Sequence, residues 1–168
     1  NLPVEQGHVQ LEGDVCYLSL VERHRGTGAV VNGFVSGFGY TDSMAIASSV
    51  AHDSHHMIVV GTNQEMMASA ANRLGEVGGG VSLWKDGSEV ALVELPIAGL
   101  MSDSKASEVA VKTQDIVQAM TDCGCNLNNA YMQHTLLALV VIPELRISDL
   151  GLVDVKRFEL TEVISSKP

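Results

Sequence analysis

The stretch MAIASSVAHDSHHMIVVGTN, residues 44–63, decides how the rest of the chain is organised. It contains two short apolar runs, residues 44–50 and 57–60, that are bounded by polar residues and glycine. Such runs are typical of buried strands. The polar insert between them therefore lies at a strand junction, and it holds three of the six histidines in the chain.

Further strands are predicted on both sides of this stretch. Residues 81–84 and 89–95 are joined by Asp86-Gly87, residue types that tolerate the positive φ of a tight hairpin turn. A third strongly apolar segment spans residues 136–142 and is closed by Pro143. Other strand-like segments cover residues 9–11, 14–22, 29–38, 145–147 and 158–164.

Two helices are also predicted. Thr62 and Glu65 have the spacing of a capping box, and a helical apolar pattern follows them until three glycines at 78–80. The second helix is expected over residues 104–123, capped by Asp103 or Ser104. Its inner stripe is Val109, Ile116, Met120 and Cys123.

This order of elements predicts an α+β fold, a layered sandwich of mixed β-sheets with two long helices packed on the outer faces. The length of 168 residues fits one domain. We expect a lead-in segment at residues 1–13, the α+β domain at 14–164 and a tail at 165–168. Because residue 1 is Asn and no secretory apolar region follows it, we also expect the chain to be part of a longer protein.

Composition excludes several function classes. The chain has 20 acidic and 10 basic residues and a net charge of −10, so it lacks the basic surface that nucleic-acid binding requires. No apolar run reaches the roughly 20 residues of a membrane helix. With 46% hydrophobic and only 18% charged residues, we expect one face to be covered by another domain or subunit.

Cysteine usage predicts a reducing, cytoplasmic location. The three cysteines are Cys16, Cys123 and Cys125, an odd and sparse set. The Cys-Gly-Cys spacing of the last two could hold a soft metal, but no second cysteine pair completes such a site. We therefore interpret these cysteines as buried small apolar side chains.

The histidine-rich insert is the main candidate for chemistry. His52, Asp53, His55 and His56 have side chains that bind zinc, iron or manganese, that hydrogen-bond a substrate, or that build a structural polar turn. These three interpretations stay open. Ser54 is a poor candidate nucleophile, because sequence neighbours seldom converge as a triad and no Gly-x-Ser-x-Gly motif surrounds it.

A basic turn, Arg23-His24-Arg25, forms the only local cluster of positive charge in the sequence. Its residues are interpreted as a solvated hairpin tip or as an anion or partner contact. Together with Glu22, the turn could also supply an acid, a charge clamp and a proton carrier.

Four ordered blocks carry a resemblance to a known family. The run SSVAHDSH at 48–55 with IVVGTN at 58–63 resembles the C-terminal domain of bacterial adenine deaminases, in the amidohydrolase superfamily. The other blocks, in chain order around it, are VERH at 21–24 with GTG at 26–28, LPIAGLMS at 95–102, and VIPEL at 141–145 with GL at 151–152. The blocks span almost the whole chain, although His56 stands where the family commonly has Asn.

The resemblance implies a parent hydrolase that converts adenine and water to hypoxanthine and ammonia, in purine salvage and adenine catabolism. A divalent metal, manganese or iron, would be held by an N-terminal barrel domain, and no metal is expected on this chain. The isolated 168-residue chain is expected to be inactive. The implied partners are the barrel, adenine and further copies in a homo-oligomer, with no nucleic acid and no membrane.

The resemblance also places the histidine insert at the face that meets the barrel. His52 and His55 are the candidate catalytic residues. The candidate substrate-binding residues are His52, Asp53, Ser54, His55, Met101 and Ser102. The alternative is a structural or oligomerisation module with no direct catalytic role.

Overall fold

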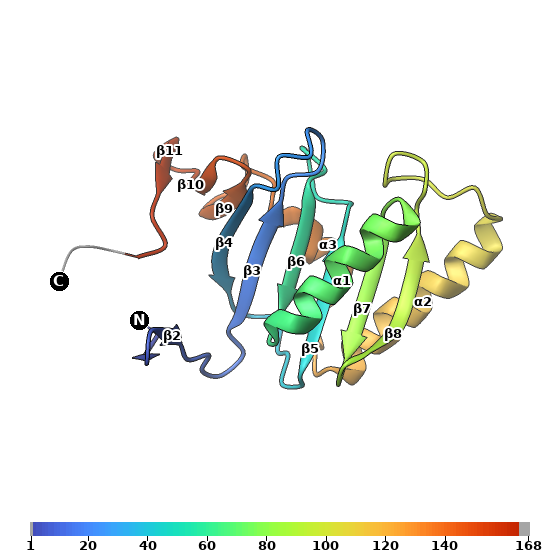
Figure 1. Cartoon of the computed structure of the whole chain (residues 1–168), viewed down its shortest axis with the longest axis horizontal. Helices are drawn as coiled ribbons and strands as arrows, with labels where there is room; N and C mark the ends of the chain where they lie inside the picture. The colour runs from blue at the N-terminus through green and yellow to red at the C-terminus, as the bar shows by residue number, and fades with distance from the viewer. Residues whose placement is uncertain (1, 165–168) are drawn as a thin grey trace.

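A six-stranded sheet forms the centre of the molecule (Figure 1). The computed structural model describes residues 2–164. The strand order is β4-β3-β6-β5-β7-β8, and neighbouring strands are antiparallel throughout. The strands are β3 (Cys16–Val21), β4 (Val30–Val35), β5 (Met44–Ser48), β6 (Met57–Gly61), β7 (Gly80–Lys85) and β8 (Ser88–Glu94).

The two apolar runs of the central stretch are the middle strands β5 and β6. All ten of their residues are buried, because the sheet is covered on both faces. Ala47 pairs with Val59, and Ile46 pairs with Val60. The continuous apolar character of these runs therefore reflects burial on two sides, as predicted for them.

Helices cover both faces of the sheet. Helix α1 (Gln64–Val77) lies on the front face in Figure 1, while α2 (Ala106–Asp122) and α3 (Ala130–Leu136) lie behind it. Leu74 of α1 packs on Ala47 and Val59 of the front face. Ile116 and Met120 of α2 belong to the core of the back face. Full burial of each such large side chain contributes roughly 1.5–3 kcal/mol.

Smaller elements lie beside β4 and at the start of the chain. The strands β1 (Val4–Glu5) and β2 (His8–Val9) form a short hairpin within the expected lead-in segment. A three-stranded antiparallel sheet contains β9 (Leu145–Ser148), β10 (Gly151–Asp154) and β11 (Glu159–Thr161). The predicted tail at 165–168 falls outside the described residues.

The α+β class is confirmed, and the structure differs from the predicted arrangement in its details. Every strand pairing between residues 2 and 164 is antiparallel, and helices form the layers on both sides of the large sheet. The apolar segment at 136–142 is not a strand. Its first residue, Leu136, ends α3, a short helix that the sequence patterns did not predict, and residues 137–142 form turns.

The predicted helix caps are wrong by one or two residues. The side chain of Asn63 accepts the hydrogen bond from the Met66 amide, and Thr62 instead donates its hydroxyl to the carbonyl of Asp42. Helix α2 begins after Lys105, which makes no side-chain cap. The turn at Asp86-Gly87 is confirmed, since both residues have positive φ, 49° and 83°.

Candidate functional site

Three connections meet at the upper end of the sheet in Figure 1. They are the β3–β4 turn at residues 22–29, the β5–β6 connection at 49–56 and the β8–α2 connection at 95–105. We call residues 52–56 the histidine loop. Because β3 pairs with β6, and Val21 lies opposite Met57, residues 22–24 start directly beside residues 55–56.

The histidine loop is a turn rather than an extended segment. The amide of His55 donates to the carbonyl of Ala51 at 2.7 Å, and His55 has a φ of +53°. The amide of His52 donates to the carbonyl of Thr135 at the end of α3. As a result the rings of His52 and His55 lie edge to face, with centroids 5.2 Å apart.

The side chains of this loop differ in their exposure. Asp53 and Ser54 are exposed, and His52 and His55 are half-buried. In residues 2–164, Nδ1 of His55 is buried and has no hydrogen-bond partner. Burial, with the nearby His52 and Arg23, lowers the pKa of His55. A neutral imidazole carries one hydrogen-bond donor nitrogen and one acceptor nitrogen.

His56 is buried and packs against the β3–β4 turn. It is only 6% exposed, and its ring lies 4.6 Å from the ring of His24. Its Nδ1 is 3.9 Å from the Glu22 carboxylate, and its Nε2 is 3.7 Å from the carboxylate of Asp149. These contacts anchor the base of the loop.

Glu22 fixes the neighbouring turn. Its carboxylate is 8% exposed and accepts hydrogen bonds from the amides of His24, Arg25 and Thr27 and from the hydroxyl of Thr27. These bonds, those of the Thr27 and Arg25 amides first, lower the pKa of Glu22 to about 2. Glu22 is therefore an acceptor that shapes the turn and not an acid that donates a proton.

Substituting Glu22 with Gln should make the stability of the 168-residue chain less dependent on pH. A carboxylate whose pKa is lowered on folding stabilises the fold above pH 4.5, and this contribution disappears as the pH falls toward 2. The gap in urea midpoint between the wild type and Glu22→Gln should therefore narrow below pH 4.5. A gap that stays constant from pH 7 to pH 3 would contradict this assignment.

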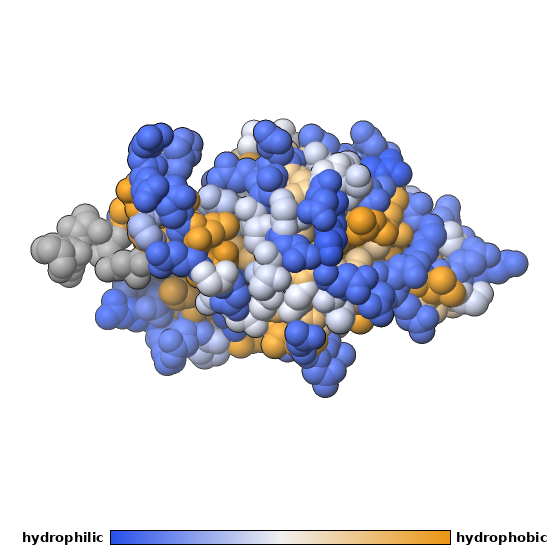
Figure 2. Space-filling view, turned by 90° about the horizontal axis from the view of Figure 1, so that it is seen from below, coloured by the Kyte–Doolittle hydropathy of each residue, from blue (hydrophilic) through white to orange (hydrophobic). Residues whose placement is uncertain are grey.

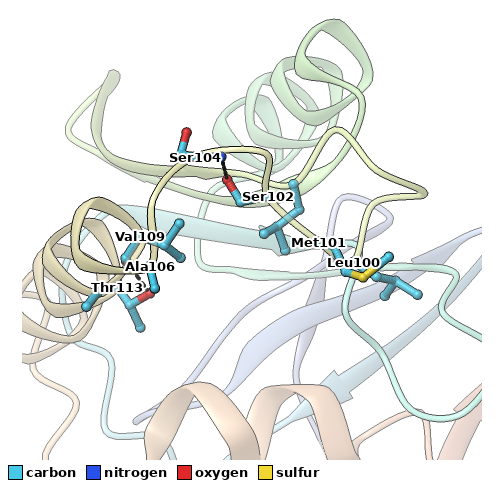
Figure 3. A pocket seen from close by; sticks show the side chains of 9 residues that line it. Leu100, Met101, Ser102, Ser104, Ala106, Val109 and Thr113 are labelled. Carbon is cyan, nitrogen blue, oxygen red and sulfur yellow. Dashed lines mark hydrogen bonds between the residues drawn. The ribbon is translucent and has the colours of Figure 1, made fainter.

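Met101 and Ser102 line a groove beside α2. The groove has a volume of about 630 Å³, and its mostly apolar walls come from the 95–104 connection and the first turns of α2 (Figure 3). Figure 3 also shows the hydroxyl of Ser102 accepting a hydrogen bond from the amide of Ser104. Met101 is 58% exposed. Both residues belong to the β8–α2 connection, which lies at the same end of the sheet as the histidine loop (Figure 1).

The upper end of the sheet exposes apolar as well as polar side chains. The upper end exposes the apolar side chains of Ile97, Leu100 and Met101 close to the histidine loop. Figure 2 shows the lower end, where hydrophilic residues predominate and hydrophobic ones appear in separate small groups. An apolar surface beside polar groups is typical of a contact or binding face.

A metal does not fit the side chains that the structure describes. Between residues 2 and 164, no three His, Cys, Asp or Glu side chains could hold a metal ion together. Cys123 and Cys125 are buried, and burial raises the pKa of the Cys123 thiol to about 11, which opposes the thiolate that a metal needs. No step through a metal is assigned to these residues.

The structure adds Arg23 to the predicted site. Its guanidinium donates to the backbone carbonyls of His55 and Ala98. The sequence showed a basic turn here but not its contacts. The β3–β6 pairing, which joins segments more than 30 residues apart, brings Arg23 beside His55, and the contact with Ala98 joins residues 75 apart.

Comparison with known proteins identifies the family to which this chain belongs. Residues 1–159 match the model of the family described as "Adenine deaminase C-terminal domain". The chain belongs to this family. The domain is 72% identical to an adenine deaminase of Roseobacter denitrificans, over 98% of this chain and 28% of that protein. It is 69% identical to adenine deaminase 3 of Rhizobium meliloti and 44% identical to an adenine deaminase of Moorella thermoacetica.

Each match includes 97–98% of this chain but only about 28% of the length of the relative. The resemblance based on four blocks is therefore confirmed. Within the described residues, no helix is long and apolar enough to cross a membrane.

Proposed function

We propose that the domain is part of an adenine deaminase, a hydrolase that converts adenine and water to hypoxanthine and ammonia. The family match over residues 1–159 is the observation that carries this proposal. The printed names of the relatives, with identities up to 72%, support it. The remaining length of those relatives leaves room for a separate catalytic domain, which we take to be the N-terminal barrel.

Within this enzyme, the domain would contribute polar side chains on the substrate side. His52 and His55 have half-buried rings in the connection between β5 and β6, and the ring centroids lie 5.2 Å apart. Adenine presents ring nitrogens that accept hydrogen bonds and an amino group that donates them. We therefore assign substrate contacts to His52 and His55, with the remaining substrate-side residues being Asp53, Ser54, Met101 and Ser102.

The rings of His52 and His55 suit orientation of the substrate or transfer of a proton. A neutral imidazole accepts a proton at one nitrogen while it donates from the other. The lowered pKa of His55 keeps its ring neutral at neutral pH. The divalent metal, manganese or iron, belongs in this proposal to the barrel and not to the described residues.

Further features of the parent protein follow from the same proposal. Residues 14–164 would form one α+β domain, preceded by a lead-in segment at 1–13 and followed by a tail at 165–168. We place the enzyme in the cytoplasm, in purine salvage, and as a homo-oligomer. Buried, unbridged cysteines in the described chain are compatible with a reducing compartment.

Ammonia release from adenine tests whether the hydrolytic centre lies outside this domain, as proposed. The full-length protein with manganese or iron should release ammonia and form hypoxanthine, and the isolated 168-residue chain should release none under the same conditions. Guanine serves as the control substrate. Metal-dependent ammonia release by the isolated chain would place the hydrolytic centre in this domain and overturn the proposal.

A further inference from the structure

Arg23 connects the histidine loop to the β8–α2 connection. Its Nε donates to the carbonyl of His55 at 2.6 Å, and its Nη2 donates to the carbonyl of Ala98 at 2.9 Å. The Arg23 amide also lies 3.5 Å from Nδ1 of His56. One side chain therefore holds two segments that are more than 40 residues apart in the sequence.

The segment around Ala98, residues 97–101, packs closely against the Arg23 guanidinium. Gly99 has a φ of +73°, and a Cβ built on it would lie 3.0 Å from both terminal nitrogens of Arg23. The Gly99 carbonyl accepts a hydrogen bond of 2.6 Å from the hydroxyl of Ser49, at the start of the β5–β6 connection. Residues 97–101 are thus fixed from two sides, by Ser49 and by Arg23.

The turn that carries Arg23 is itself rigidly built. The buried Glu22 carboxylate accepts bonds from the amides of His24, Arg25 and Thr27. The ring of His24 adds a contact of 2.6 Å between its Nε2 and the carbonyl of Ser54. The basic turn is therefore held by its own hydrogen bonds and supports the histidine loop.

We infer that Arg23 is a positioning residue, which holds the His55 ring and the Met101–Ser102 segment in one fixed arrangement for substrate. The catalytic part of this inference rests on the proposed function. The structural part, that both segments lose order together when the guanidinium is removed, depends only on the hydrogen bonds. Small displacements of a substrate-orienting group can cost up to a hundredfold in rate.

Arg23 also acts on His55 through its charge. The ionisable groups that face His55 are His52, Asp53, His24 and Arg23. Burial is the largest cause of the lowered pKa of His55; His52, Arg23 and His24 lower it further, whereas Asp53 raises it. Removing the guanidinium should therefore let His55 protonate at a higher pH.

Two substitutions in the full-length protein separate these effects. Arg23→Gln removes the charge and the fork of donors, while Arg23→Lys keeps the charge but not the paired geometry. Arg25→Gln is the matched control, since its side chain makes no hydrogen bond among the described residues. The readouts are hydrogen exchange of peptides covering 52–56 and 97–101, and the pH profile of kcat/KM for adenine.

In Arg23→Gln we expect faster exchange in both segments, kcat/KM about tenfold lower at pH 8, and an acidic limb displaced to higher pH. Arg23→Lys should show the faster exchange with the acidic limb of the wild type. Arg25→Gln should match the wild type. If Arg23→Gln also matches the wild type in exchange and in pH profile, Arg23 is not a positioning residue.

The experiment also distinguishes this inference from the proposed function. If His55→Ala leaves kcat/KM unchanged, the substrate role of the loop fails, and exchange in the Arg23 variants still decides the structural link. Should Arg23→Gln fail to fold, faster exchange confined to the two segments in Arg23→Lys supports the link, and wild-type exchange in that variant overturns it.

Discussion

Replacing His55 with Ala in the full-length protein is expected to lower kcat/KM for adenine by about a hundredfold. The ring is half-buried, and its Nδ1 makes no hydrogen bond in the described structure, so the substitution breaks little internal bonding. The backbone carbonyl that accepts from Arg23 remains. Steady-state kinetics with adenine, together with a thermal unfolding curve, measure the effect.

His52→Ala should behave in the same direction, because its ring lies 5.2 Å from that of His55. His8→Ala is the matched control, since His8 is an exposed histidine in β2, outside the histidine loop. Wild-type kinetics in His52→Ala and His55→Ala, with an intact fold, would exclude the substrate role and favour the structural or oligomerisation module.

Acid should destabilise the domain through His134. This side chain is 2% exposed, its Nε2 lies 2.8 Å from the Tyr40 hydroxyl, and burial lowers its pKa from 6.5 to about 3. The unfolded chain therefore binds a proton between pH 6.5 and 3 that the folded chain does not bind. The free energy of unfolding should fall by about 1.4 kcal/mol per pH unit across this window, on the order of 4 kcal/mol in total.

The variant His134→Gln isolates this contribution, because Gln keeps a polar group near Tyr40 but does not titrate. Urea unfolding of the wild type and the variant at several pH values gives the difference. The wild type should lose stability relative to His134→Gln as the pH falls from 6.5 to 3, and His8→Gln, which removes an exposed histidine, should follow the wild type. Parallel curves for the wild type and His134→Gln would exclude His134 as the sensor.

Local sequence patterns predicted most of the secondary structure correctly. Strands β5 and β6 are continuous apolar runs because helices cover both their faces, and the Asp86-Gly87 turn has the backbone that its residue types permit. The predicted positions of the helix caps were wrong by one or two residues. At α1 the reason is that the Thr62 hydroxyl donates to the carbonyl of Asp42 instead. Helix α3 was missed because a seven-residue segment with mixed polarity carries little periodic signal.

The candidate site was predicted only in part. The sequence located His52, Asp53, Ser54 and His55 at a strand junction, and the resemblance set His56 apart, because the family commonly has Asn at that position. The structure buries His56 against Glu22 and Asp149. The sequence could not show that Arg23 binds the histidine loop. That contact requires β3 to pair with β6, and sequence patterns define strands without defining their partners.

The sequence by itself determined the family and the α+β class, through four ordered blocks and the periodicity of its apolar residues. Only the tertiary structure decided which polar groups meet. Tyr40 and His134 are 94 residues apart in the chain, and Arg23 and Ala98 are 75 apart. Apolar periodicity records the side of an element that is buried, whereas a hydrogen bond between distant residues depends on strand order and register, which are fixed when the whole core packs.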